Sequence, residues 1–461
     1  MKYFALHKEH YRKTLVLAYP IILAQMGQML TGIVDNMMVG RVSTAALAAS
    51  SFANGIFSNI MIFGMGFAFG LTPLIGKAIG QKDTDKVSNL LRHSILVNII
   101  LGVVLTVLLF ICSQFMHLMG QPKDVYELAT PYFLVISSSM LPLMLFFTFK
   151  QFTEGISITK PAMFFTLLSN ALNIILNYIL IYGKLGFPAL GLIGAGWATL
   201  ISRVLQAVGL FAYIWYAKKF SQYNKHKNHQ FIFRKETISE LFKLGTPIAL
   251  QLTMEVAAFA MGTIMMGWVG KVELAAHQIA LSLASLTFMT VSGIALATTV
   301  RVSNQMGEGN YKEMRLAGIT SVQMVVVFMV LCGMAFFLLN EWLPIAFTED
   351  KNVISVAASL LLIAAVFQVS DGIQVTMMGA LRGLSDVNRP TYIALVAYWF
   401  IALPVAYIFT FKLDFNEVGI WLGLVCGLSM AAILLLFRFH KLTKKMIVEQ
   451  RAIKSDPSIV V

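Results

Sequence analysis

Charged residues are scarce in this chain. Only 12% of its 461 residues are Asp, Glu, Lys or Arg, whereas soluble proteins average about 25%. Hydrophobic residues make up 58% of the chain, and the mean hydropathy is +0.76. This composition excludes an ordinary soluble domain. It predicts a polytopic membrane protein.

Cysteine is almost absent as well. The three cysteines, Cys112, Cys332 and Cys426, each fall inside an apolar stretch, and no CxxC pair occurs. Isolated cysteines of this kind behave as small buried hydrophobic residues. The sequence therefore excludes a disulfide framework and gives no sign of redox or zinc chemistry.

Sequence motifs of soluble enzymes are missing too. There is no GxxxxGK[ST] loop for ATP and no HExxH zinc motif, and His277, which borders the predicted span 278–305, has no catalytic partner of this kind. We expect no enzymatic activity and no cofactor. The amino-terminal stretch MKYFALHKEHYRK is too charged for the core of a signal peptide, so we expect the first span to be retained.

Long apolar stretches are abundant instead. Each is continuous rather than alternating, which is typical of helices that cross about 30 Å of hydrocarbon and excludes a β-barrel. The sequence predicts an all-α membrane protein with twelve transmembrane helices, at residues 14–39, 46–75, 90–115, 126–148, 161–183, 190–216, 241–269, 278–305, 316–340, 353–378, 391–411 and 416–437.

The distribution of basic residues predicts the orientation. With the amino terminus in the cytoplasm, 28 of the 35 Lys and Arg residues fall in cytoplasmic segments and 6 in external loops. Because basic residues favour the cytoplasmic side, we expect both termini there. The formal charge of +13 is then explained by anionic lipid headgroups of the bilayer, and no nucleic-acid partner is needed.

Two halves of the chain repeat. GRVSTAALA at 40–48 resembles GKVELAAHQ at 270–278, EGISITKP at 154–161 resembles RGLSDVNRP at 382–390, and Pro20 corresponds to Pro247. Six spans separate equivalent positions, which predicts two six-helix bundles related by a pseudo-two-fold axis along the membrane normal. The expected organisation is a cytoplasmic amino-terminal segment (1–13), an amino-terminal lobe (14–216), a cytoplasmic linker (217–240), a carboxyl-terminal lobe (241–437) and a basic cytoplasmic tail (438–461).

Three carboxylates stand inside predicted spans: Asp35, Glu255 and Asp371. Each costs at least about 2.5–3.5 kcal/mol in hydrocarbon, so each requires a reason. Polar residues at helical spacing lie near them in sequence or on the fifth span. These candidate supporting residues are Asn36, Asn170, Asn173, Asn177, Gln251, Gln368 and Gln374.

The three acids predict a cation or proton pathway. Arg203 is the one basic residue that the sequence places in mid-span, so the acids are largely uncompensated. Carboxylate and amide oxygens could bind Na⁺, and a carboxylate could instead take up a proton. The amides alone could equally be helix-packing groups. Arg203 is either a counter-ion to one acid or a residue that reaches the interface, and Pro20 is either a hinge or an early-helix proline.

Several stretches resemble the multidrug and toxic compound extrusion (MATE) family, in its bacterial NorM branch. They are YPIILAQMGQMLTGIVDNMMVGRVSTAALAA, LNIILNYILIYG, TPIALQLTMEV and QVSDGIQVTMMGALRGLSDVNRP. The resemblance covers residues 14–437. It implies two six-helix bundles and export of organic cations in exchange for Na⁺ or H⁺. It assigns Asp35, with Asn173 and Asn177, to an amino-terminal cation site, and Glu255 with Asp371 to a carboxyl-terminal one.

The expected function is therefore a secondary active multidrug exporter that works by alternating access. Its substrates would be cationic, partly apolar drugs, and its coupling ion Na⁺ or H⁺. We expect a monomer in the bacterial inner membrane. Two alternatives stay open: a flippase for a lipid-linked precursor, which should need basic residues for phosphates, and an ion-coupled exporter of an endogenous metabolite.

Overall fold

The chain forms helices throughout the part that the structure describes. This computed structural model describes residues 2–224 and 233–455, and no strand occurs within them. Residues 225–232 of the predicted linker and 456–461 of the predicted tail lie outside the described residues. The described part contains 12 helical spans long and apolar enough to cross a membrane. The prediction of twelve helical spans is confirmed.

The helices divide between two compact units. The amino-terminal unit is Leu23–Ala249, and the carboxyl-terminal unit combines the described residues of Met1–Ile22 and Leu250–Val461. In chain order the elements are α1 (Lys2–Gly40), α2 (Thr44–Phe69), α3 (Leu71–Gly80), α4 (Thr84–Gln114), η1 (Met116–Leu118), α5 (Lys123–Ser138), α6 (Met140–Gly155), α7 (Lys160–Tyr182), α8 (Gly191–Tyr216), η2 (Lys218–Phe220), α9 (Ser221–Asn224), α10 (Lys235–Val269), α11 (Lys271–Gly307), α12 (Tyr311–Leu338), η3 (Pro344–Ala346), α13 (Lys351–Gly383), α14 (Asn388–Leu395), the π-helix η4 (Val396–Ala402), α15 (Leu403–Phe411) and α16 (Asn416–Ser455).

The boundaries between these units differ from the predicted lobes. Instead of falling in the polar linker, they fall inside α1, between Ile22 and Leu23, and inside α10, between Ala249 and Leu250. Both are continuous helices, so the chain passes from one unit to the other without a loop. A linker is recognised in a sequence by its polarity, and neither crossing is polar.

Glycines show that the start of each crossing helix packs in an equivalent way. In the amino-terminal unit, a Cβ on Gly66 of α2 would lie 2.7 Å from the Cα of Ala249. In the carboxyl-terminal unit, a Cβ on Gly293 of α11 would lie 3.2 Å from the backbone nitrogen of Ile22. Both pairs are related by the predicted repeat spacing. Only glycine allows helices to approach this closely, so the repeat in the sequence reflects a repeated helix contact.

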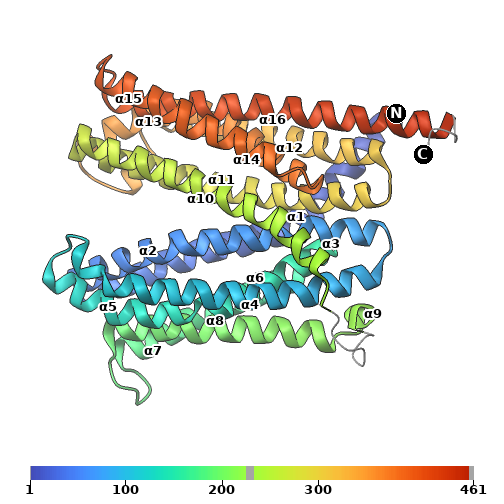
Figure 1. The fold of residues 1–461 in the computed structure, drawn as a ribbon. Coiled ribbons are helices and arrows are strands. Elements are labelled where there is room, and N and C mark those ends of the chain that lie inside the picture. The colour runs from blue at the N-terminus through green and yellow to red at the C-terminus, as the bar shows by residue number, and fades with distance from the viewer. Residues whose placement is uncertain (1, 225–232, 456–461) are drawn as a thin grey trace. The chain divides into compact units, whose positions relative to one another are not determined.

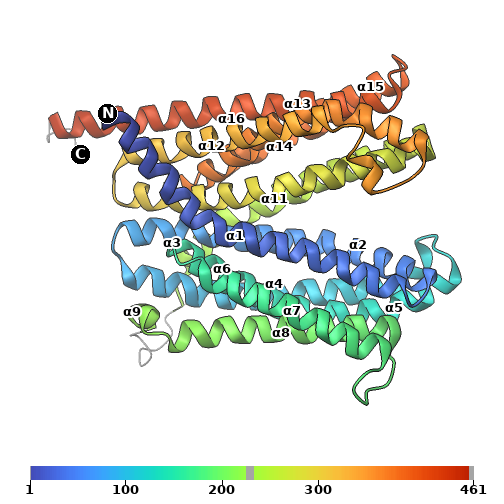
Figure 2. The same cartoon turned by 180° about the vertical axis from the view of Figure 1, so that it is seen from behind.

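Figure 2 shows the start of α1 beside helices of the carboxyl-terminal unit, and polar side chains attach it to them. Nη1 of Arg301 in α11 donates to the carbonyl of His10, at 3.0 Å, and to Oγ1 of Thr14, at 2.6 Å. Nε2 of His10 lies 2.9 Å from Oε2 of Glu313 in α12. One turn further along, Ala18 is fully buried among apolar residues of α11 and α12. Residues 7–22 are therefore an integral part of this unit.

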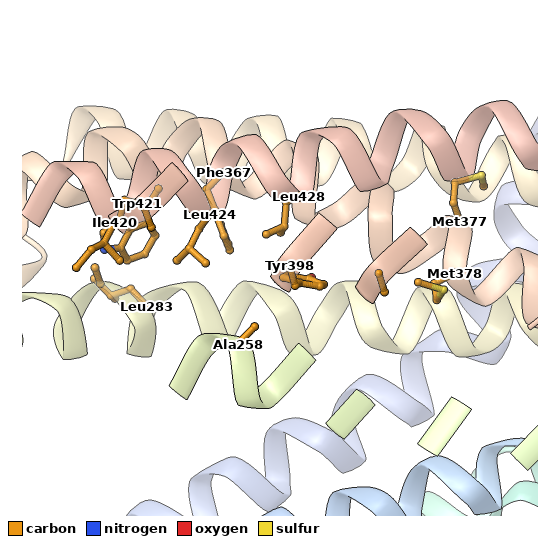
Figure 3. Packing of buried hydrophobic residues seen from close by; sticks show 14 of the residues in the cluster. Ala258, Leu283, Phe367, Met377, Met378, Tyr398, Ile420, Trp421, Leu424 and Leu428 are labelled. Carbon is orange, nitrogen blue, oxygen red and sulfur yellow. The ribbon is translucent and has the colours of Figure 1, made fainter. Parts of the chain in front are cut away.

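The core of the carboxyl-terminal unit surrounds α13, which packs along α11, α12 and α16 (Figure 1). In Figure 3 the labelled side chains run in a row from Ile420 and Trp421 at one end to Met377 and Met378 at the other, with Tyr398 between them. Trp421 and Tyr398 are among the largest fully buried side chains of the described residues. This packing fixes the helices that carry Glu255, Asp371 and Tyr398.

The glycine contact at the crossing of α10 gives a first prediction. Replacing Gly66→Leu should lower the free energy of unfolding by about 1–3 kcal/mol or more, because the new side chain meets the backbone of α10. Thermal unfolding of the purified protein in detergent measures the change. The matched control is Gly32→Leu in α1, where a Cβ would meet nothing within 4 Å. Equal melting temperatures for Gly66→Leu and the unmodified protein would contradict the prediction.

Candidate functional site

Asp35 lies beside two asparagines of α7, Asn173 and Asn177. Nδ2 of Asn177 donates to Oδ1 of Asp35 at 2.6 Å, and also to Oδ1 of Asn173 at 3.2 Å. When the Asn173 amide is turned over, its nitrogen lies 2.9 Å from the same Asp35 oxygen, and this bond replaces the one that its oxygen accepts from Asn177. All three residues belong to the amino-terminal unit. The structure thus brings together the acid and two of the amides that the sequence suggested.

The other two asparagines do not join this group. Asn36 is exposed. It follows Asp35 directly, and because neighbouring residues of a helix point about 100° apart, the two side chains do not share a face. Asn170 lies beside Gly27, where its Nδ2 would be 3.1 Å from an added Cβ. That Nδ2 is buried without a hydrogen-bond partner among the described residues. Two helical turns separate Gly27 from Asp35, so Asn170 belongs to a different level of the helix pair.

Arg203 of α8 lies within the electrostatic range of Asp35. Its Nη1 donates to Oγ of Ser139 at 2.6 Å, and its guanidinium lies 4.8 Å from the centre of the Phe57 ring. No ion pair within 4 Å joins it to Asp35 in the described chain. The arginine is therefore held inside the unit by a hydroxyl and an aromatic ring, at a distance from which it still offsets the charge of Asp35. This position favours a counter-ion over a residue reaching for the interface.

Glu255 of α10 is the centre of a second polar group, in the carboxyl-terminal unit. The hydroxyl of Tyr398 donates to Oε1 of Glu255 at 2.9 Å. Gln251 and Gln374, both buried, interact with the same carboxylate. Asp371 is 4% exposed and feels the charge of Glu255. The two acids that the sequence grouped by family resemblance therefore share one polar cluster.

Gln368 does not belong to that cluster. Its Oε1 accepts a hydrogen bond from Oγ1 of Thr287 in α11, at 2.9 Å, and it is fully buried. Gln374, in contrast, acts on Glu255. The sequence put Gln368 and Gln374 on the face of Asp371 by spacing alone, and the neighbouring helices send them to different partners.

Tyr398 is a residue that the sequence reasoning missed. It lies in the π-helix Val396–Ala402, whose wider turn is a frequent feature of functional sites. Pro404 follows, and because proline has no N–H, the carbonyl of Phe400 loses its normal helical partner. Trp399, which follows Tyr398 in the chain, donates from Nε1 to the backbone carbonyl of Met254 at 3.1 Å. A proline inside an apolar span was the signal that could have revealed this irregular turn.

Arg382 is the second missed residue. The predicted tenth span ends at residue 378, before Arg382, but in the structure this residue lies in the last turn of α13. Its Nη2 donates to Oε1 of Gln251 at 3.0 Å, and its charge acts on Glu255. The long side chain of a residue at the helix end reaches back along the helix. A cation therefore joins the carboxyl-terminal acids.

His277 is a core histidine. Its Nδ1 accepts a hydrogen bond from Nε1 of Trp421 at 3.1 Å, and its Nε2 lies 3.1 Å from Oγ1 of Thr263. Both ring nitrogens are thus occupied by structural partners. Across the described residues, no group of three or more His, Cys, Asp or Glu side chains could hold a metal ion. Of the candidate Na⁺ ligands, Asp35 belongs to one unit and Glu255 and Asp371 to the other.

Pro20 lies inside α1, two residues before the boundary between the units, and Pro247 lies in the same relation to the boundary in α10. The helix continues through both residues. Each proline removes one backbone hydrogen bond within its helix. This placement agrees with the hinge interpretation of Pro20 and extends it to its repeat equivalent.

The hydrogen bond from Tyr398 gives a second prediction. Tyr398→Phe should lower the free energy of unfolding by about 1.5–3 kcal/mol while Glu255 is ionised, because a charged acceptor loses its donor. Thermal unfolding should show a clearly smaller loss in a Glu255→Gln background. Tyr407→Phe, at an exposed position of α15, is the control. An equal loss in both backgrounds would show that Tyr398 acts only through packing.

Comparison with known proteins agrees with the repeat. The MatE family model matches residues 20–179 and again 247–408. The two matches start at Pro20 and Pro247, which the sequence analysis paired. Together they cover more than half of the chain, so two copies of one family unit account for most of the spans.

Several curated relatives extend over nearly the whole chain. The chain is 33% identical over 451 residues to a probable multidrug resistance protein NorM of Mannheimia succiniciproducens, covering 95% of each. It is 34% identical over 446 residues to the corresponding Rhizobium meliloti protein, covering 95% of this chain and 94% of that one. A multidrug resistance protein NorM of Photobacterium profundum is 31% identical over 444 residues, with 94% and 96% covered.

Solved structures share the fold. An outward-facing MATE family transporter of the MOP superfamily superposes with a TM-score of 0.87 at 23% identity, covering 94% of this chain and 96% of that one. A eukaryotic MATE transporter gives a TM-score of 0.85 at 21% identity, with 96% and 99% covered. The expected all-helical architecture of two six-helix bundles is thereby confirmed, as is the resemblance found in the sequence.

Proposed function

Because this chain belongs to the MatE family, we propose that it is a secondary active multidrug exporter that exchanges Na⁺ or H⁺ for organic cations. Support for multidrug export comes from relatives that match nearly the whole chain and are described as multidrug resistance proteins. Support for cation coupling comes from the carboxylates within the spans. The carrying observation is that Glu255, which accepts a hydrogen bond from Tyr398, lies close enough to the buried Asp371 to act on it electrostatically.

The energetics of these acids favour cation binding. Hydrogen bonds from Asn177 and Tyr398 stabilise carboxylates but do not neutralise them. An uncompensated charge in a span is costly, and acids in spans commonly mark ion or proton pathways. A bound Na⁺ or proton removes this cost. The ion therefore has a physical reason to enter the spans, and the family provides the type of cycle.

In the proposed cycle, a Na⁺ ion or a proton enters from outside and binds one or more of the three acids. Its positive charge opposes a cationic drug at the same carboxylates, so the drug leaves outward. The ion then leaves on the cytoplasmic side, and the vacated acids attract the next drug. Exchange follows from mutual exclusion, since drug and ion compensate the same negative charge.

The substrate class follows from charge and from apolar content. Carboxylates attract cations, and the chain holds 26 Met and 34 Phe residues. Methionine side chains adapt to varied apolar shapes. We propose cationic, partly apolar drugs as substrates. A flippase for phosphate-bearing lipids is less favoured, because Arg203 and Arg382 are each committed to a polar neighbour, Ser139 and Gln251.

The basic residues support an orientation with both termini in the cytoplasm. The predicted cytoplasmic segments hold 28 Lys and Arg and the external loops hold 6, in line with the positive-inside bias. The 12 candidate spans and the bacterial relatives favour the inner membrane. We propose that one chain is the transporting unit, because each of the two polar groups is assembled within a single unit of this chain.

Transport by the purified protein tests this function. Proteoliposomes loaded with ethidium bound to DNA should lose fluorescence under an inward Na⁺ gradient or an inward proton gradient, applied separately. Asp35→Asn and Glu255→Gln should each slow dye release at least about tenfold, because each removes a charge from a proposed coupling site.

The control for these variants is Asp414→Asn, which makes the same chemical change at an exposed turn. Asp414 has a positive φ of 54°, which asparagine also tolerates, so this variant should transport normally. Full activity of Asp35→Asn would overturn its role in coupling. Dye release that ignores both gradients would overturn the antiport mechanism itself.

A further inference from the structure

The ends of α6 and α13 are built alike. In the amino-terminal unit, Oγ1 of Thr72 donates to Gln151 of α6, with Oε1 at 2.6 Å and the backbone carbonyl oxygen at 3.3 Å. In the carboxyl-terminal unit, Oγ1 of Thr299 donates to the carbonyl of Gly379 at 2.8 Å. The donors are 227 residues apart and the acceptors 228 residues apart in the sequence. The two helix ends therefore occupy equivalent places in the two units.

A charged residue follows each acceptor by three positions, and the two charges differ in sign. In α6 it is Glu154, which is 1% exposed and lies 3.9 Å from Nζ of Lys150 on its own helix. In α13 it is Arg382, and its partner lies on a different helix. The amino-terminal unit thus cancels the charge at this position locally. In the carboxyl-terminal unit, the charged residue at this position contacts Gln251 of the candidate site instead.

A short polar chain links Arg382 to the acids. Its Nη2 donates to Gln251, and Gln251 interacts with Glu255, one helical turn further along α10. The Nε of Arg382 is buried without a hydrogen-bond partner within the described residues. No ion pair within 4 Å neutralises Arg382 there. Its charge is therefore available to the Glu255–Asp371 group through one intervening amide.

Counting charges distinguishes the two units. In the amino-terminal unit, the one negative charge of Asp35 is opposed by the one positive charge of Arg203, and Glu154 is paired with Lys150. In the carboxyl-terminal unit, the charge of Arg382 acts on Glu255, and the charge of Glu255 acts on Asp371. With both carboxylates ionised, one negative charge is left over among these groups at Glu255–Asp371, and one bound Na⁺ or one proton would neutralise it.

We propose that Arg382 is a fixed counter-cation of the Glu255–Asp371 group and limits that group to one monovalent cation. Arg382 acts as a positioning residue through Gln251 and does not bind the transported ion itself. The inference rests on the proposed cation coupling and deepens it. It sets the number of monovalent cations held at the Glu255–Asp371 group at one.

Equilibrium binding of Na⁺ to the purified protein, with net proton uptake measured in parallel, tests the assignment. The unmodified protein should bind one Na⁺ or take up one proton at this group, and Glu255→Gln should remove that event. Arg382→Gln should bind a second cation, or bind the first at least roughly tenfold more tightly, because a nearby unit charge no longer repels it. Arg382→Lys, which keeps the charge, should bind one.

Two further variants separate charge from damage to the fold. The double variant Glu255→Gln with Arg382→Gln retains one net negative charge and should bind a single cation. Arg203→Gln, in the other unit, should leave binding at Glu255–Asp371 unchanged. If Arg382→Gln does not give a monodisperse protein, Arg382→Met, which keeps an unbranched stem of similar length, takes its place.

The outcomes distinguish the inference from the function on which it rests. If the unmodified protein binds a cation that depends on Glu255, and Arg382→Gln binds the same number with the same or weaker affinity, the role of Arg382 is overturned and cation coupling stands. If the unmodified protein shows no Glu255-dependent Na⁺ binding or proton uptake, coupling at this group and the role of Arg382 are both overturned.

Discussion

A charge inside hydrocarbon must find a partner, and this constraint governs the polar residues within the spans. Asp35 receives an amide from α7, Glu255 receives a hydroxyl from the π-helix in the eleventh span, and both feel an arginine. Each of these partners comes from another helix. The site therefore depends on helices being packed closely and in register. Glycine contacts such as Gly66 on α10 and Gly293 on α1 provide that closeness.

The two units repeat the same helix contacts but differ in their charged residues. Their helix crossings and the threonine bonds at the ends of α6 and α13 recur at nearly the same spacing. The charged residues do not recur, since Glu154 stands where the other unit has Arg382. Under the proposed function, this difference in charge would give one cation a defined place at Glu255–Asp371.

Much of the candidate site could be predicted from helical spacing. Asn177 with Asp35, and Gln251 with Glu255, lie together as the sequence suggested. Helical spacing did not predict the partner where a neighbouring helix supplies it. Gln368, for example, accepts a hydrogen bond from Thr287 of α11. Helical spacing also failed for Asn36, which follows Asp35 directly and so points elsewhere. Tyr398 and Arg382 were missed because one depends on a π-turn and the other on a long side chain reaching back from a helix end.

The sequence by itself determined the membrane setting, the twelve helices, the twofold repeat, the family resemblance and the three acids. These follow from hydropathy, charge distribution and residue spacing, which are properties of the chain order. Only the tertiary structure decided that α1 and α10 are shared between units, that Gln374 rather than Gln368 serves Glu255, and that Arg382 joins the acids. The reason is physical: which polar groups meet depends on how neighbouring helices are rotated and how closely they pack, and one helix's sequence does not contain that information.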